Sequence, residues 1–246
     1  MELGLAESVS LETVRKTLKK TNLSLGGKSS GASPSAEYVA CMEDVLDLYE
    51  EPYDPKRPMI CMDETSKQLV LETRLPMPTI PGYPGRYDFE YQRNGTRNLF
   101  MFCEPLRGFR HVEVTERRTA QDFAQQMKWL VDDAYPEADV VCVVLDNLNT
   151  HKVASLYKAF EPAEARRIAR RLEFHFTPKH GSWLNMAEIE FSVLSRQCLN
   201  RRIPDEQTLK REVAAHEKAR NQVKAMINWQ FTSINARTKL EHIYPS

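Results

Sequence analysis

A run of six apolar residues, Val140 to Leu145, constrains the fold of this chain more than any other feature. The run is rich in valine and leads directly into Asp146. A continuous apolar run of this length is typical of a β-strand buried on both faces, as occurs when helices cover both sides of a sheet. Open α/β sheets bind their ligands at the carboxyl ends of the strands. The run therefore predicts an α/β fold with a carboxylate at its functional edge.

Residues 59–65 have the same form: a second short apolar run, which ends in the carboxylate pair Asp63 and Glu64. Residues 66–86 contain four prolines and two glycines, which predicts an irregular segment. Asn94-Gly95 predicts a hairpin turn between two of the strands that follow. These later strands are predicted from alternating aromatic and β-branched residues, at 88–91, 97–103 and 110–114.

Helical periodicity dominates the rest of the chain. Thr119 is a good N-cap for one of these helices, and Pro162 interrupts another. Helices are predicted at 37–51, 119–135, 153–171, 183–199 and 205–225, and a further strand at 172–176. Antiparallel strands followed by alternating helices and strands predict a mixed sheet flanked by helices.

Overall composition indicates an ordinary globular protein. Lys and Arg together number 34, as do Asp and Glu, so a DNA-binding surface would require local segregation of charge. The five cysteines are scattered and form no CxxC pair, which favours reduced thiols over a disulfide framework or a zinc site. No apolar run approaches the ~18 residues of a membrane span, and no signal peptide is visible. We therefore expect a cytoplasmic protein with no membrane association.

The N-terminal segment combines a short helix with a flexible connection. Residues 8–21 are predicted to be helical, and residues 24–36 form a Gly/Ser-rich linker. One face of the helix is basic, which is typical either of a solvated helix or of a recognition helix that contacts DNA phosphates. We interpret residues 1–23 as a partial helix-turn-helix, with a candidate DNA-binding face formed by Arg15, Lys16, Lys19 and Lys20.

Three acidic residues stand at positions where a sheet and a helix could bring them together. Asp63 and Asp146 each end a predicted strand, and Glu188 lies early in a predicted helix. Each one alone is also typical of a turn, a helix cap or a solvated surface. Three neighbouring carboxylates repel one another unless a hard divalent cation with oxygen ligands, such as Mg²⁺, holds them. Two such ions about 3.5–4 Å apart can catalyse phosphoryl transfer.

Three sequence blocks resemble, in order, the catalytic blocks of mariner-type DDE transposases, most closely those of the bacterial insertion-sequence branch. The blocks are Cys61–Thr65, Leu145–His151 and Pro178–Glu188. The resemblance extends over residues 37–246 and implies a ribonuclease-H-like catalytic domain. It also implies Mg²⁺- or Mn²⁺-dependent cleavage and strand transfer at the ends of an insertion sequence.

The same resemblance implies roles for individual residues. Asp63, Asp146 and Glu188 match the catalytic, metal-binding acids, since Glu188 stands three residues after Asn185 as in the family's block. Glu190 is the alternative third acid; it lies about 200° around the helix from Glu188, so only one of the two can face the metal. Further DNA-binding positions implied by the motifs are Asn147, His151, Lys179, His180, Trp183 and Asn185.

The implied partners are double-stranded DNA, as transposon inverted repeats and target DNA, and a second copy of the chain, because two element ends must be paired. The implied location is the nucleoid. Two other functions remain open at this stage. The short N-terminal region suggests a catalytically inactive, truncated copy that binds DNA or dimerises as a regulator. Another ribonuclease-H-like nuclease, acting on RNA–DNA hybrids, is the third possibility.

Overall fold

The computed structural model describes residues 8–9, 36–74, 80–82 and 89–245. Its centre is a five-stranded sheet in the order β4-β3-β2-β5-β6. Within this sheet β3 runs antiparallel to both of its neighbours, β2 and β4, whereas β5 and β6 run parallel to β2. The mixed sheet is as predicted. The strands are β2 (Met59–Glu72), β3 (Tyr91–Glu104), β4 (Phe109–Thr115), β5 (Val141–Leu145) and β6 (Leu172–Phe176).

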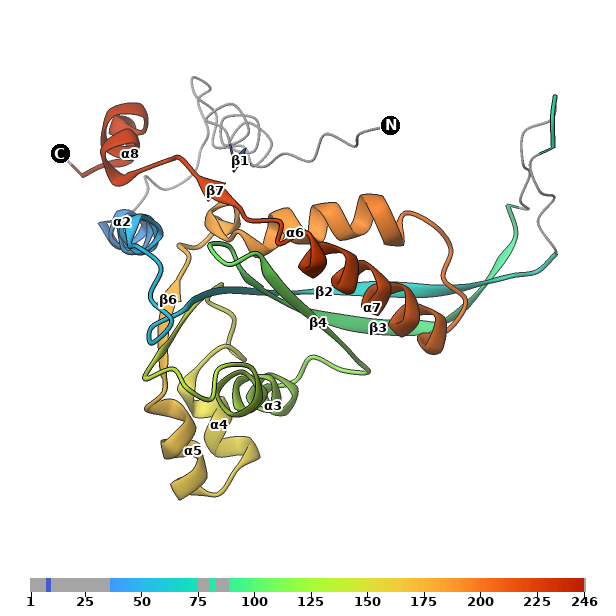
Figure 1. The fold of residues 1–246 in the computed structure, drawn as a ribbon, viewed down its shortest axis with the longest axis horizontal. Helices are drawn as coiled ribbons and strands as arrows, with labels where there is room; N and C mark the ends of the chain where they lie inside the picture. Colours follow the sequence, from blue (N-terminus) through green and yellow to red (C-terminus); the bar gives the residue numbers. More distant parts are fainter. Residues whose placement is uncertain (1–7, 10–35, 75–79, 83–88, 246) are drawn as a thin grey trace.

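Helices cover both faces of this sheet (Figure 1). Side chains alternate between the faces, so Cys61 and Val144 join one hydrophobic cluster while Ile60 and Val143 join the other. On the first face lie α2 (Ala36–Glu50), α6 (Ala187–Leu194), α7 (Glu206–Gln222) and α8 (Ser233–Lys239). On the second lie α3 (Ala120–Trp129), α4 (Val153–Ala159) and α5 (Pro162–Ala169). This double covering explains why every residue of β5 is buried.

Local sequence signals set several helix boundaries as predicted. Thr119 caps α3: its hydroxyl accepts a hydrogen bond from the Asp122 amide, and the Asp122 carboxylate accepts one from the Thr119 amide. Pro162 divides the predicted helix 153–171 and forms the first residue of α5. Short non-α turns extend two helices, η1 (Leu130–Ala134) after α3 and η3 (Ser195–Leu199) after α6.

The predicted hairpin turn at Asn94-Gly95 is wrong. Both residues lie inside β3, which pairs with β2 along its length. The register shifts between Gln68 and Val70, and Gly95 has φ +88°, so the two residues form an irregularity within the strand pair. Strand β2 accordingly continues to Glu72, through residues expected to be irregular, and the β2–β3 pair projects beyond the helices (Figure 1).

The N-terminal prediction is only partly covered by the described residues. Ser8–Val9 forms strand β1, which pairs in parallel with β7 (Asn228–Trp229), so the helix expected over 8–21 does not begin at Ser8. The basic face formed by Arg15, Lys16, Lys19 and Lys20 lies outside the described residues, as does the linker up to residue 35. In the part of the chain that is described, no helix is long and apolar enough to cross a membrane.

Candidate active site

The parallel pairing of β2 and β5 brings the two candidate aspartates to one edge of the sheet. The last paired residues are Cys61 and Val144, and both face the cluster beneath α2 and α6. Asp63 and Asp146 each follow two residues later, so they keep the same register and the same face. The strand register alone therefore places the two carboxylates next to each other.

Glu188, in the first turn of α6, completes the acidic group. Burial, together with the negative charges of Glu188 and Asp146, raises the pKa of Asp63 to about 7. Burial also raises the pKa of Glu188, although its hydrogen bond with Asp63 opposes the shift; Asp146 adds to the increase. The three side chains thus interact electrostatically, and each still has access to solvent.

The repulsion between Asp63, Asp146 and Glu188 bears on whether these residues can hold a metal ion. Three carboxylates supply only oxygen ligands, the set that Mg²⁺ and Mn²⁺ prefer. A divalent cation would bind the ionised forms and remove the repulsion that raises the pKa of Asp63. The chemistry of the three carboxylates therefore fits such an ion, although in the described structure their oxygens do not all lie within 4.8 Å of one another.

Asn185 connects the acidic residues of β2 and α6. Its Nδ2 donates to the carbonyl oxygen of Met62 (2.8 Å), the residue before Asp63. Its Oδ1 accepts from the amide of Ala187 (3.0 Å), the residue before Glu188. The side chain is only 1% exposed. One buried amide therefore fixes the separation between the elements that carry Asp63 and Glu188.

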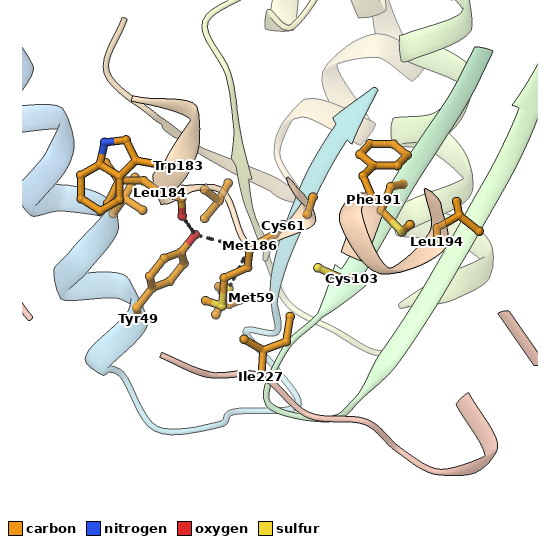
Figure 2. Packing of buried hydrophobic residues seen from close by; sticks show 14 of the residues in the cluster. Tyr49, Met59, Cys61, Cys103, Trp183, Leu184, Met186, Phe191, Leu194 and Ile227 are labelled. Carbon is orange, nitrogen blue, oxygen red and sulfur yellow. Dashed lines mark hydrogen bonds between the residues drawn. The ribbon is translucent and has the colours of Figure 1, made fainter. Parts of the chain in front are cut away.

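The segment before α6 is held from the other side by α2. The hydroxyl of Tyr49 donates to the carbonyl oxygen of Leu184 (2.7 Å) and lies 3.5 Å from the Sγ of Cys61 (Figure 2). Tyr49, Leu184 and Cys61 are all buried. Helix α2 thus stabilises the segment that positions Asn185 and Glu188.

Replacing Asn185 with alanine is expected to lower the stability by about 1–3 kcal/mol, because the Met62 carbonyl and the Ala187 amide lose their buried partner. Asn185→Asp keeps the acceptor for Ala187 and loses the donor to Met62. We expect both variants to weaken metal binding in a titration followed by thermal unfolding. Metal affinity equal to that of the parent in both would contradict a positioning role for Asn185.

His151 lies beneath Asp146, on the side away from solvent. Its Nδ1 is 2.5 Å from the Oδ1 of Asp146, its Nε2 is 3.7 Å from Oε2 of Glu64, and the residue is 0% exposed. Burial alone would lower the pKa of His151, but the hydrogen bonds and charges of Asp146 and Glu64 raise it to about 9. The charged imidazole orients Asp146 and balances two carboxylates. No motif in the sequence pairs His151 with Glu64.

Glu190, the alternative third acid, faces away from this group. Its Oε1 accepts from Nη2 of Arg110 (2.7 Å) and from Nη2 of Arg220 (2.8 Å), and its side chain is 1% exposed. Burial opposes ionisation of Glu190, but the two guanidinium groups lower its pKa. The geometry therefore favours Glu188 as the third acid.

The other predicted DNA contacts fall into two groups. Asn147, which follows Asp146 directly, is exposed, as are Lys179 and His180 in the segment between β6 and α6. The remaining three are buried, which favours a positioning role over the direct DNA contact that the motifs imply: His151, Trp183 and Asn185.

Residues 58–210 match the family described as DDE superfamily endonuclease. The chain belongs to this family. The matched range contains Asp63, Asp146 and Glu188; it begins just before β2 and ends within the first part of α7. No curated protein matches the chain.

Solved structures of the Mos1 mariner transposase share the fold of this DDE-family chain. The catalytic domain of that transposase aligns with a TM-score of 0.55 and 11% identity, over 89% of this chain and 94% of the other. Its paired-end complex with the left transposon end aligns with a TM-score of 0.54 and 16% identity. In that complex and in the paired-end complex with Mn, the alignment covers 88% of this chain and 66% of the transposase chain. The chain thus spans about two-thirds of the transposase's length.

Proposed function

We propose that this protein is a transposase of the bacterial insertion-sequence branch, which cleaves DNA at the ends of an element and joins the freed 3′ ends to target DNA. The single observation that carries the proposal is the interaction of Asp63, Asp146 and Glu188 at one edge of the sheet. Membership in the DDE superfamily endonuclease family supports the reaction class.

In this proposal, Asp63, Asp146 and Glu188 hold Mg²⁺ or Mn²⁺. The bound ions would supply Lewis acidity at the scissile phosphate and an activated attacking oxygen. The chain's own contribution is positional: β2 and β5 set the two aspartates, Asn185 sets Glu188 relative to Asp63, and His151 orients Asp146. Fixing these groups before the reaction lowers the entropic part of the barrier.

The DNA would lie across the exposed edge of the sheet. Asn147, Lys179 and His180 can reach phosphates there, because all three are exposed and follow the strands that end at the acidic group. The structures of the Mos1 transposase with transposon ends support DNA as the partner. We further propose a homodimer acting on chromosomal DNA in the cytoplasm, since two element ends must be brought together.

The proposed function is tested with DNA that carries the inverted repeats flanking the gene. We expect cleavage at the element ends and strand transfer with Mg²⁺ or Mn²⁺, and no reaction with a chelator. An RNA–DNA hybrid of equal length serves as the control substrate. Binding of the ends without cleavage, or preferential cleavage of the hybrid, would contradict the proposal.

The raised pKa of Asp63 predicts a characteristic pH dependence of stability without metal. The folded-state pKa of Asp63, about 7, exceeds the ordinary aspartate value of 3.8. The stability contributed by protonated Asp63 is therefore complete below about pH 4 and is lost as the pH rises through 7. Asp63→Asn removes the loss and should be more stable than the parent at pH 8 by about 1–3 kcal/mol, after allowance for partial solvent screening. Urea unfolding in chelator at several pH values measures this difference.

Addition of Mg²⁺ should reverse the order of stability. The parent gains binding free energy and the variant gains little, because the amide cannot replace the ionised ligand. Parallel pH profiles for parent and variant in chelator would show that Asp63 does not experience the repulsion described.

A further inference from the structure

A second group of ligating side chains lies on β5 and β6, away from the acidic edge. Cys142 of β5 is paired in register with Glu173 of β6, and His175 follows two residues later on the same face. One ligand atom from each residue lies within 4.8 Å of the others. Among the residues that the structure describes, no other set of three His, Cys, Asp or Glu side chains meets this condition.

Two separations in this group are close to the edges of a tetrahedral metal site. The Sγ of Cys142 lies 3.7 Å from Oε2 of Glu173, and Nε2 of His175 lies 3.2 Å from Oε1 of Glu173. Zinc–ligand bonds of about 2.3 Å to sulfur and 2.0–2.1 Å to nitrogen or oxygen give tetrahedral edges of roughly 3.5 Å for S–O and 3.3 Å for N–O. Because the two contacts use different oxygens of Glu173, the carboxylate must turn so that one oxygen faces both Sγ and Nε2 before the three side chains can share an ion.

The histidine also has the outer partner that metal-binding histidines usually have. Its Nδ1 lies 2.9 Å from Oδ2 of Asp44 on α2. A proton on Nδ1, donated to this carboxylate, leaves the Nε2 lone pair directed towards Glu173 and Cys142. Asp44 therefore sets the tautomer that a metal requires.

Arg57 already contacts this group. Its guanidinium donates to both oxygens of Glu173, from Nη2 (3.0 Å) and Nε (3.3 Å). Each carboxylate oxygen has a second lone pair, so Glu173 can keep Arg57 as an outer partner while it binds a metal. The thiolate of Cys142 with Glu173 and Asp44 carries three negative charges, which Arg57 and a divalent ion balance.

The ligand set and its exposure indicate which ion the site would select. A thiolate and an imidazole favour Zn²⁺ or Co²⁺ strongly over Mg²⁺, whose ligands are oxygens. Cys142 is fully buried and the Glu173 side chain is 43% exposed, so the group borders solvent at Glu173. Burial raises the pKa of Cys142 to about 12, so the metal must displace the thiol proton when it binds.

We propose that Cys142, Glu173 and His175 form a Zn²⁺ site, with water as the fourth ligand, that fastens α2 to β5 and β6. Cys142 precedes Asp146 by four residues along β5, about 13 Å away, so the site is separate from the acidic group. The proposal also revises the expectation from cysteine spacing, because the three ligands are distant in sequence and meet only through strand pairing.

Cobalt serves as the spectroscopic probe. The full chain in excess Mg²⁺, titrated with Co²⁺, should develop a thiolate-to-Co²⁺ absorption band in the near ultraviolet with a stoichiometry of one. Cys142→Ser should abolish the band, whereas Cys198→Ser, which removes another buried thiol, should leave it unchanged. No band in the parent, or a band that persists in Cys142→Ser, would overturn the proposal.

Asp44→Asn tests the site without altering a buried residue, since the Asp44 side chain is 52% exposed. We expect Zn²⁺ binding weakened about 10- to 100-fold in competition with a chromophoric chelator, as for other outer-shell substitutions. Asp47→Asn, one turn away on α2, is the matched control. Equal Zn²⁺ affinity in Asp44→Asn and the parent would contradict the assigned role of Asp44. None of these measurements depends on DNA cleavage, so they stand apart from the proposed transposase activity.

Discussion

Asp146→Asn is expected to reduce metal-dependent cleavage of element-end DNA by on the order of 10³-fold or more, with little effect on the fold. The substitution preserves the shape of the side chain and removes its charge. The amide oxygen can still accept a hydrogen bond from His151, whose Nδ1 lies 2.5 Å from the Oδ1 of Asp146. The loss would therefore come from metal binding and not from unfolding.

The change in stability caused by Asp146→Asn has a predictable sign. The pKa of His151 is raised to about 9 partly by Asp146, so the charged histidine contributes stability that is complete below pH 6.5 and is lost as the pH rises through 9. Glu64 remains as a partner after the substitution. At pH 7 we expect a stability decrease of about 1 kcal/mol at most.

Asp139→Asn is the matched control, because it makes the same chemical change at the exposed residue near the start of β5. It should cleave as the parent does. Single-turnover cleavage with Mg²⁺ and with Mn²⁺, alongside urea unfolding, measures both effects. If Asp146→Asn cleaves like the parent, the assignment of Asp146 is wrong; if it is unfolded, Asp146→Glu provides the second test.

Local patterns were sufficient to predict the position of the two aspartates. The apolar runs before Asp63 and Asp146 mark buried strands, and parallel strands end at the same edge of a sheet. These positions depend on short segments and on one rule of sheet topology. The spacing from Asn185 to Glu188 predicts the third acid by resemblance only, and the role of Glu188 stays a prediction.

Features that depend on pairing between distant segments were not predictable in the same way. Asn94-Gly95 has the composition of a hairpin turn, and only the register of β3 against β2 reveals an irregularity within a strand. His151 and Glu64 meet because β2 ends beside the loop after β5. The buried position of His151 thus follows from tertiary packing, whereas its sequence context suggested an exposed loop.

Substitutions at Glu188 and Glu190 should separate an effect on cleavage from an effect on stability. The two residues lie in the same helical turn, and Glu188→Gln and Glu190→Gln are chemically identical changes. Glu188 is exposed and interacts with Asp63, whereas Glu190 is buried with two arginines. We expect Glu188→Gln to lose cleavage and keep its stability, and Glu190→Gln to lose stability and keep its cleavage.

Glu188→Gln should lose cleavage to the same order as Asp146→Asn while it keeps or slightly raises the stability of the metal-free protein. The neutral amide removes one of the charges that raise the pKa of Asp63, so the folded state loses a repulsion. Single-turnover cleavage and urea unfolding in chelator measure the two effects. Normal cleavage by this variant would exclude Glu188 as the third acid.

Glu190→Gln should instead destabilise the protein by about 3–5 kcal/mol, because it leaves buried guanidinium groups without their counter-charge. Arg110 joins β4 to this carboxylate and Arg220 joins α7 to it, so one substitution loosens the contact of both elements with α6. The molecules that remain folded keep all three carboxylates of the acidic group. Cleavage scaled to the folded fraction, measured at low temperature, should therefore approach that of the parent. A stable but inactive Glu190→Gln would reverse the assignment and make Glu190 the metal ligand.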